Sequence, residues 1–171
     1  MISRPQPDEY AEFAASYVNL VGKDPILKIL TNQQNNTYNL LKGLACNKAD
    51  YTYAEGKWTV KQVAGHMADT ERILAYRALC FSREAITLPG FDQDVYIEKS
   101  SFNNRSLDDI AGEFKIIRES TLYLFRSITE EQSKRQGIAS DHPFSVRGLA
   151  YMIAGHELHH LNILKKRYLI K

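Results

Sequence analysis

The sequence has no long apolar run, few cysteines and almost no excess charge of either sign. None of its 171 residues lies in a stretch of the ~18 apolar residues that a membrane span needs. Residues 1–9 lack the apolar segment of a secretory signal peptide. Cys46 and Cys80 have no motif spacing around them, so we expect reduced thiols in a cytoplasmic protein. With a net charge of +2 and no basic stretch, the chain is not expected to bind nucleic acid.

Strand signals are also scarce, whereas helical periodicity extends over most of the chain. Only short pieces such as residues 51–53 have the composition of a strand, and no partner strand is apparent. Apolar residues make up 44% of the chain, enough for a substantial core. We therefore predict an all-α fold, a single four-helix-bundle domain over residues 1–171. The long helices are expected at about residues 24–45, 59–84, 106–128 and 145–168, with a short one at about 8–20 packing across them.

Capping signals mark the expected helix starts. Thr59 and Gln62 have the spacing of a capping box, in which the threonine hydroxyl accepts from the glutamine amide and the glutamine side chain reaches back. Ser106 is expected to begin the third long helix. Asp24, followed by Pro25, is expected to cap the first.

The connection between the second and third long helices, about residues 85–105, is unusually long. Loops of this length are uncommon in compact domains and are often functional. An extended chain of about twenty residues spans up to about 65 Å, whereas a helix of about twenty-five residues is about 38 Å long. The connection can therefore cross the whole bundle and allow these two helices to run parallel.

The histidines are concentrated near the C-terminus. Three of the five fall within residues 156–160. His156 and His160 are four residues apart, which places them about 40° apart on one helical face and one turn from each other. They occupy the apolar seam of their helix together with Leu149 and Ile153. Burying two imidazoles without a partner is costly, and a shared divalent metal ion removes that cost.

His66, on the second long helix, is the candidate for a third ligand. Its distance from the start of that helix matches the distance of His160 from the end of the fourth, so the two meet if these helices are antiparallel neighbours. The alternative is a lone, hydrogen-bonded core histidine. Gly65 and Gly155 each precede a histidine and are expected to let the two helices approach closely.

Other polar residues near this pattern are expected to stay out of the metal's coordination shell. His159 lies about 60° from His156 around the helix and is expected at the surface or behind a ligand. Glu157 is expected to be solvated. Asp69 is expected to be solvated, with a place behind His66 as the alternative. His142 is expected in a plain loop ahead of the fourth helix.

Three sequence segments resemble the DinB-like superfamily. Residues 57–71, KWTVKQVAGHMADTE, resemble its first signature, and residues 88–92, LPGFD, resemble its crossover loop. Residues 145–147, SVR, followed by residues 154–160, AGHELHH, resemble its last helix. The resemblance extends from about residue 24 to about residue 168. It implies an up-down-down-up bundle that holds one divalent metal ion on His66, His156 and His160, and a homodimer.

The resemblance also implies a range of reactions. The family includes proteins described as metal-dependent hydrolases and thiol-dependent transferases, among them bacillithiol transferases and maleylpyruvate isomerases that use mycothiol. Imidazole ligands alone suit zinc, nickel, copper and iron. Zinc or nickel is favoured, with iron and manganese as alternatives, and a low-molecular-weight thiol is a candidate second cofactor.

Two functions fit these residues. The first is a divalent-metal-dependent hydrolase or thiol S-transferase acting on a small molecule, because three imidazoles leave a coordination position open. The crossover would bring Asp94, Tyr96 and Phe102 toward that position. Asp94 and Tyr96 are the candidate substrate-binding residues, although Tyr96 and Phe102 can equally cover the core. The second is a non-catalytic, metal-stabilised binding or dimerisation module, which a fourth protein ligand would favour.

Overall fold

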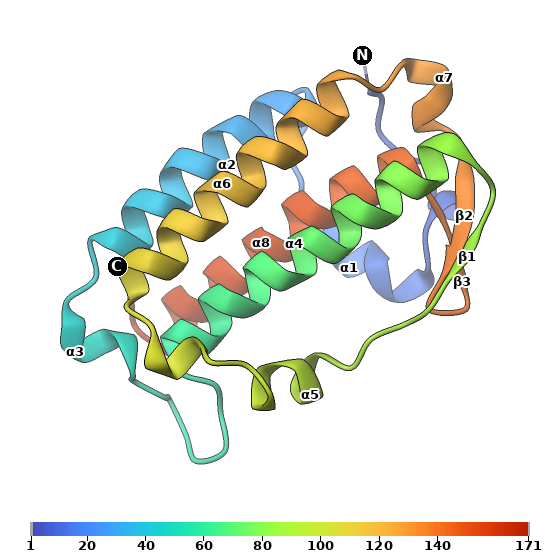
Figure 1. The fold of residues 1–171 in the computed structure, drawn as a ribbon. Helices are drawn as coiled ribbons and strands as arrows, with labels where there is room; N and C mark the ends of the chain where they lie inside the picture. Colours follow the sequence, from blue (N-terminus) through green and yellow to red (C-terminus); the bar gives the residue numbers. More distant parts are fainter. Residues whose placement is uncertain (1, 171) are drawn as a thin grey trace.

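The computed structural model describes residues 2–170, and four long helices lying side by side dominate it (Figure 1). They are α2 (Ile26–Lys42), α4 (Val60–Arg83), α6 (Leu107–Arg126) and α8 (Val146–Arg167). The shorter helices are α1 (Ala15–Val18), α3 (Cys46–Ala49), α5 (Gln93–Glu98) and α7 (Glu130–Ser133). The predicted four-helix bundle is confirmed. Among residues 2–170, no helix combines the length and the apolar character that crossing a membrane would take.

The long helices neighbour one another out of sequence order. Both α2 and α4 pack against α6 and α8, so α2 lies diagonally opposite α4. In Figure 1, α4 and α6 run in the same direction, whereas α2 and α8 run in the opposite one. The connection after α4 makes this possible, because it returns along the outside of the bundle, through α5 and a 3-10 turn at Phe102–Asn104, to the start of α6.

Side-chain caps fix where most of these helices begin. The amide of Gln62 donates to Thr59 Oγ1 at 3.1 Å, and the amide of Thr59 donates to Gln62 Oε1 at 2.8 Å, which completes the expected capping box. The hydroxyls of Ser106 and Ser145 cap α6 and α8. The expectation for Asp24 is wrong: Pro25 is the N-cap of α2, and Asp24 accepts from Lys28 Nζ at 3.0 Å instead.

A small three-stranded sheet closes one end of the bundle, and the sequence did not predict it. Strands β2 (Gln136–Ala139) and β3 (His142–Ser145) form an antiparallel hairpin. Strand β1 (Thr87–Leu88), at the start of the crossover, pairs with β2 in parallel. These strands have only two to four residues, and in β2 the buried positions are Gly137 and Ala139 whereas Ile138 is exposed, so the sequence shows no apolar alternation. Residues 51–53, which have strand composition, lie in the irregular loop before α4, and His142 begins β3 rather than lying in a plain loop.

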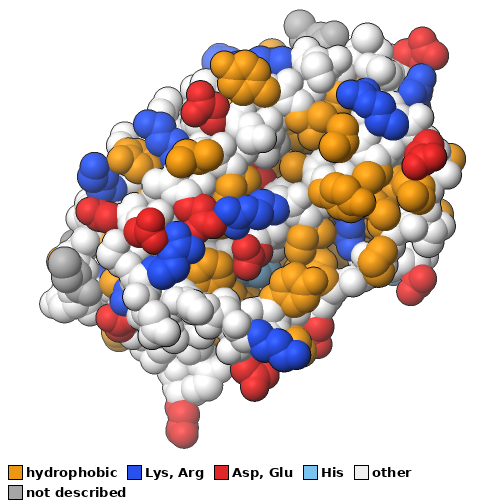
Figure 2. Space-filling model, in the orientation of Figure 1, with side chains coloured by type: hydrophobic (Ala, Val, Ile, Leu, Met, Phe, Trp, Pro, Cys, Tyr) orange, Lys and Arg blue, Asp and Glu red, His pale blue; other side chains and the backbone are white. Residues whose placement is uncertain are grey.

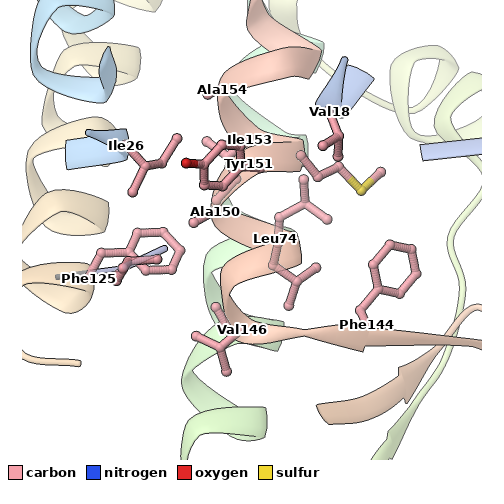
Figure 3. Packing of buried hydrophobic residues seen from close by; sticks show 14 of the residues in the cluster. Val18, Ile26, Leu74, Phe125, Phe144, Val146, Ala150, Tyr151, Ile153 and Ala154 are labelled. Atoms are coloured by element: carbon pink, nitrogen blue, oxygen red, sulfur yellow. The ribbon is translucent and has the colours of Figure 1, made fainter. Parts of the chain in front are cut away.

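The apolar core is in two parts. The part nearer the sheet includes Leu74, Phe125, Phe144, Val146 and Ile153 (Figure 3). The part at the other end includes Leu41, Met67, Phe114, Leu164 and Tyr168. On every long helix, buried polar side chains occupy the turns between the two parts. The bundle is thus two apolar cores joined by a polar middle layer, and the metal candidates lie in that layer.

Of the two cysteines, the structure describes the side chain of Cys80. Cys80 is a free thiol that packs, partly buried, against the core nearer the sheet. The side chain of Cys46 lies outside the described part of the chain.

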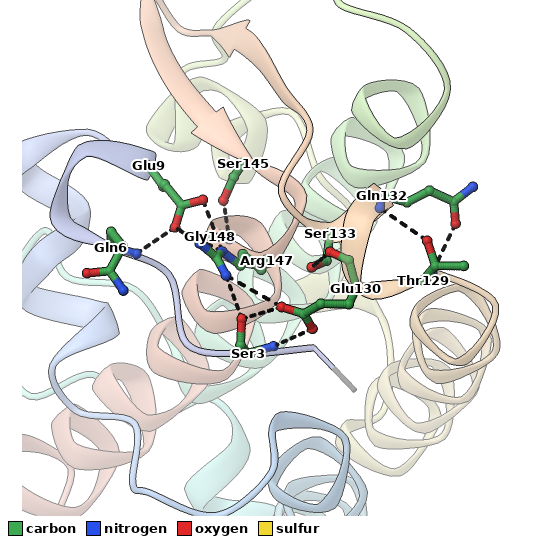
Figure 4. Close-up of polar contacts among 10 residues, drawn as sticks. All are labelled: Ser3, Gln6, Glu9, Thr129, Glu130, Gln132, Ser133, Ser145, Arg147 and Gly148. Atoms are coloured by element: carbon green, nitrogen blue, oxygen red, sulfur yellow. Dashed lines mark hydrogen bonds and ion pairs between the residues drawn. The ribbon is translucent and has the colours of Figure 1, made fainter.

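The N-terminal segment packs along α8 without forming the continuous helix expected at about residues 8–20. It makes two 3-10 turns, Pro7–Glu9 and Glu12–Ala14, before α1. Arg147 of α8 anchors it, since Nε donates to both carboxylate oxygens of Glu9 at 2.9 and 3.0 Å and Nη1 donates to Ser3 Oγ (Figure 4). This segment covers a side of α8 that would otherwise face solvent.

Gly155 and Gly65, beside the histidines, each permit a close approach, though not the approach between α4 and α8 that the sequence suggested. A Cβ on Gly155 would lie 2.1 Å from the carbonyl oxygen of Tyr17, so this residue brings α8 against α1. A Cβ on Gly65 would lie 2.4 Å from the Phe102 ring, so this one brings α4 against the crossover. Glycine at these two positions therefore lets α1 and the crossover lie close to the histidine-bearing helices.

We predict that Gly155→Ala destabilises the protein by about 1–3 kcal/mol, because the methyl group would overlap backbone rather than a flexible side chain. Gly112→Ala, in α6, is the matched control, because a Cβ added there would meet nothing within 4 Å. That variant should be stabilised by about 0.5–1 kcal/mol. Urea unfolding measures both, and equal effects at the two positions would contradict the close contact at Tyr17.

Candidate metal centre

His66, His156 and His160 meet in the polar middle layer. His66 lies six residues after Val60, the first residue of α4, and His160 lies seven residues before Arg167, the last of α8. Because α4 and α8 are antiparallel neighbours, these depths bring the two imidazoles to the same level. All three side chains are buried, and their ligand atoms lie within 4.8 Å of one another.

The nitrogen positions suit a small divalent cation. His156 Nε2 lies 3.0 Å from His66 Nε2 and 3.1 Å from His160 Nε2. Tetrahedral zinc with bonds of about 2.0–2.1 Å separates its ligand nitrogens by about 3.3 Å, so the observed spacing fits within a few tenths of an ångström. Three nitrogens facing one another cannot all be satisfied by sharing protons, whereas three lone pairs directed at one cation can.

Burial keeps these imidazoles in the form that binds metal. Desolvation lowers the pKa of His66 to about 4 and that of His160 to about 3. The pKa of His156 is also well below its usual value, because of burial first and the neighbouring histidines second. All three are therefore neutral near pH 7, with a lone pair available on each ring.

Neighbouring side chains hold the rings in place. Thr70 Oγ1, one turn along α4, lies 3.4 Å from His66 Nδ1, the ring nitrogen on the side away from the other two histidines. The Trp58 ring lies 4.9 Å from the His66 ring, centroid to centroid. Tyr17 of α1 packs edge-on against His156, at 5.7 Å between centroids. The rings are thus supported from α4, from the loop before it and from α1.

A buried ion-pair network occupies the same layer and includes all four long helices. Arg118 of α6 is completely buried. Its Nε and Nη2 donate to the two carboxylate oxygens of Glu71 on α4, at 2.7 and 2.8 Å, and Nη2 also donates to Glu157 of α8 at 2.7 Å. The α2 helix contributes the Leu30 carbonyl, which accepts from Arg118 Nη1 at 3.2 Å, and the Thr37 hydroxyl, which donates to Glu157.

Glu157 is therefore not solvated, and that expectation is wrong. Its side chain is 2% exposed, and burial raises the pKa of its carboxyl while Arg118 opposes the shift. The physical reason is that α8 is buried on nearly all sides: α4, α2 and α1 all pack against it, and every residue from 146 to 157 is buried. The expectation assumed that α8 buries only one face, and such a helix buries several.

A pocket of about 570 Å³ opens beside the histidines, between the start of α4 and the end of α8. His160 lines it, together with His159. Four aromatic side chains contribute to its walls, from α1, the loop before α4 and the residue that follows α8: Tyr17, Tyr53, Trp58 and Tyr168. Lys57 and Asp94 provide one charge of each sign. Sequence reasoning missed the aromatic residues, because their segments carry no periodic pattern.

The other polar and aromatic residues singled out in the sequence lie in different parts of the structure. Asp94 lines the 570 Å³ pocket, whereas Tyr96 lines a separate pocket of about 130 Å³. Phe102 is buried against Gly65 and covers the core. Asp69 accepts from Arg72 Nη1 at 3.3 Å, on the outer side of α4.

The two histidines outside the cluster also have defined places. His159 is half-buried and packs edge-on against Tyr17 at 5.2 Å, so it lies beside the cluster and not in it. His142 is exposed and packs against Phe13, at 5.7 Å between ring centroids.

Comparison with known proteins gives the family. The sequence model of the DinB superfamily matches residues 29–164. The chain belongs to the DinB superfamily. It is 29% identical over 144 residues to an Oceanobacillus iheyensis protein named "Putative metal-dependent hydrolase", covering 81% of this chain and 79% of that protein.

A solved structure shares the fold of this DinB-superfamily chain. It is YfiT from Bacillus subtilis, described as "a probable metal-dependent hydrolase with an unusual four-helix bundle topology". The TM-score is 0.73 at 16% identity, covering 99% of this chain and 95% of YfiT.

We predict that Arg118→Met destabilises the protein by about 3–5 kcal/mol, because it leaves two carboxylates buried without a counter-charge. Arg72→Met is the matched control. Arg72 also pairs with two carboxylates, but its side chain is 47% exposed, so its loss should cost about 0–1 kcal/mol. Chemical unfolding of both variants tests this, and a cost for Arg118→Met no larger than that for Arg72→Met would be inconsistent with an organising role.

Proposed function

We propose that this DinB-superfamily chain, acting as one domain, is a divalent-metal-dependent hydrolase of a small molecule, with His66, His156 and His160 as its protein ligands. The observation that carries the proposal is the convergence of three neutral imidazoles beside an open pocket. Among residues 2–170, no carboxylate or thiolate whose side chain is described joins the cluster as a fourth ligand. The names given to the Oceanobacillus iheyensis protein and to YfiT agree with this reading. Zinc or nickel is the favoured metal.

The histidines, the aromatic side chains of the pocket and Tyr168 would have separate roles in this reaction. A divalent ion on three imidazoles supplies a Lewis acid that polarises a substrate oxygen and lowers the pKa of a water or thiol. The aromatic walls of the pocket exclude bulk water from one side of the substrate and pack against its apolar part. Tyr168 fixes one wall, because its hydroxyl donates to the Trp58 carbonyl at 2.6 Å and burial raises its pKa to about 12, which keeps it protonated.

The charges at the pocket indicate which substrates it would accept. Lys57 and Asp94 are both exposed, and neither forms an ion pair within the described residues. Each can therefore pair with an opposite charge on a ligand. A polar small molecule with an apolar part fits this lining better than a lipid or a polymer. Tyr96 stays a candidate for substrate binding only if α5 moves, since it lines the other pocket.

A thiol S-transferase is the second candidate, because the position that admits water also admits a thiol. A non-catalytic metal-stabilised module is the third. Glu71 and Glu157, the carboxylates of the same layer, both form ion pairs with Arg118. They are therefore poor candidates for a general base, and this favours the non-catalytic module. Pairing as a homodimer and a cytoplasmic location remain predictions from the resemblance and the composition.

We predict that His66→Ala, His156→Ala and His160→Ala each lose stoichiometric metal, because two imidazoles hold a divalent ion much more weakly than three. His142→Ala and His159→Ala should keep it, since neither ring belongs to the cluster. Elemental analysis of the purified variants measures the content, and circular dichroism checks that each remains helical. Full metal content in His66→Ala would exclude a site shared by α4 and α8.

We also predict that the cobalt-substituted protein changes its visible spectrum when azide or a small thiol is added, because the pocket reaches His160. The zinc- or nickel-loaded protein is then assayed on a panel of small esters and amides, with and without a thiol. Hydrolysis that needs no thiol supports the hydrolase, and thiol-dependent conjugation supports the transferase. A cobalt spectrum that no ligand changes would leave only the structural module.

A further inference from the structure

Arg77 lies beneath the crossover, away from the histidines. It is 11 residues beyond His66 on α4, which places it about 16 Å further along the helix. Only 5% of its surface is exposed. Its Nη2 donates to the Pro89 carbonyl at 2.7 Å and to Ser140 Oγ at 3.1 Å, so it joins α4 to the crossover and to the turn between β2 and β3.

Arg77 differs from the other buried arginines in having no carboxylate partner. Arg118 is paired with Glu71 and Glu157, and Arg147 is paired with Glu9. Within residues 2–170, no acidic side chain comes within ion-pair distance of Arg77. Burial lowers the pKa of Arg77, and no acidic neighbour offsets that effect. A buried cation with only neutral acceptors is an energetic anomaly in this chain.

The acidic residues nearest in sequence to Pro89 and Ser140, the two partners of Arg77, are engaged elsewhere or exposed. Asp92 Oδ1 accepts from the amides of Asp94 and Val95, where it caps α5. Asp141 follows Ser140 in the hairpin turn and is exposed.

The guanidinium retains donors that can reach a ligand. Arginine has five N–H groups, and the two contacts described above use only those on Nη2. No hydrogen bond within the described residues uses Nε or Nη1, and neither nitrogen is completely closed off from solvent. Both are therefore free to donate to a ligand, and Arg77 lines an open space beneath the crossover.

That space is a pocket of about 130 Å³ with mostly apolar walls. Besides Arg77, its lining includes Ile73, Leu88, Pro89, Phe91 and Tyr96. The rings of Phe91 and Tyr96 pack together at 5.3 Å, and the Arg77 guanidinium lies 5.8 Å from the Phe91 ring, centroid to carbon. Apolar side chains gather over α4 and the crossover on this face of the molecule (Figure 2). The volume equals about four water molecules at about 30 Å³ each, enough for a small organic group.

We propose that this pocket binds a small organic monocarboxylate, with the carboxylate on the Arg77 guanidinium and the apolar part against Phe91 and Tyr96. One negative charge balances one guanidinium, whereas a phosphate dianion would place an excess charge among apolar walls. A neutral amide of the same shape would leave the cation uncompensated. The ligand would also connect α4 to α5, the short helix whose Gln93 and Asp94 line the pocket beside the histidines.

The test uses the metal-loaded full chain and isobutyrate as the probe, followed through the arginine Nε–Hε signals in NMR spectra. Isobutyrate should shift the Arg77 signal with saturation, while isobutyramide should not. Arg77→Gln should weaken isobutyrate binding about tenfold or more, because a charge-assisted hydrogen bond is lost. Arg83→Gln is the matched control, since Arg83 is an exposed arginine on the same helix. Metal content should stay stoichiometric in both variants, which separates this proposal from the one on the histidines.

Several results would overturn the site. A non-saturating shift equal to that of the Arg83 signal means no binding, and equal binding of isobutyramide means that charge is not recognised. Tighter binding of inorganic phosphate than of isobutyrate would replace the carboxylate with a phosphate. Should Arg77→Gln fail to fold, titrations of the unmodified chain with isobutyrate and isobutyramide still show whether the pocket recognises the carboxylate charge. The Arg77 NMR signal is assigned as the one that disappears in Arg77→Lys.

Discussion

The guanidinium of Arg118 is the group around which the bundle is arranged. It is completely buried, it holds one glutamate on α4 and another on α8, and it also bonds to α2. A buried charge that loses a partner destabilises the folded state by several kcal/mol, so no long helix can turn about its axis without breaking these bonds. Directions around a helix are fixed relative to one another. The rotation of α8 that points Glu157 at Arg118 therefore also points His156 and His160 at His66.

The sequence predicted the fold and the histidine cluster because both depend on spacing. Capping residues predicted where α4 and α6 begin, and the fold and the family are confirmed. His156 and His160 share a face because they are four residues apart, and His66 meets them because its depth in α4 matches. The structure brings the three together, although their role as metal ligands remains a prediction. The pocket could not be predicted in the same way, because Tyr17 and Trp58 come from segments whose course is set only by tertiary contacts.

The expectations for Glu157, Gly155 and the short strands were wrong because each depends on contacts between segments distant in sequence. A glutamate beside a seam histidine normally faces solvent, but here α1, α2 and α4 leave α8 almost no solvent face. Gly155 was expected to bring α8 toward α4, and it instead makes room for the backbone of α1. The short strands were not predicted because β1 gains its partner from a hairpin about fifty residues later in the chain, at Ile138 and Ala139. Each of these features depends on contacts between distant segments, which local patterns do not record.

The order in which the helices neighbour one another has a consequence for folding kinetics. In a bundle with short loops, each helix packs first on the next one in the chain. Here α2 packs on α6 and α8, and α4 on α8, so most helix pairs join parts of the chain that are far apart. Closing such long loops costs entropy before any contact rewards it, and a high mean sequence separation slows folding. His66 and His156 are separated by 90 positions, so their cluster forms only once nearly the whole chain has been made and α8 has docked.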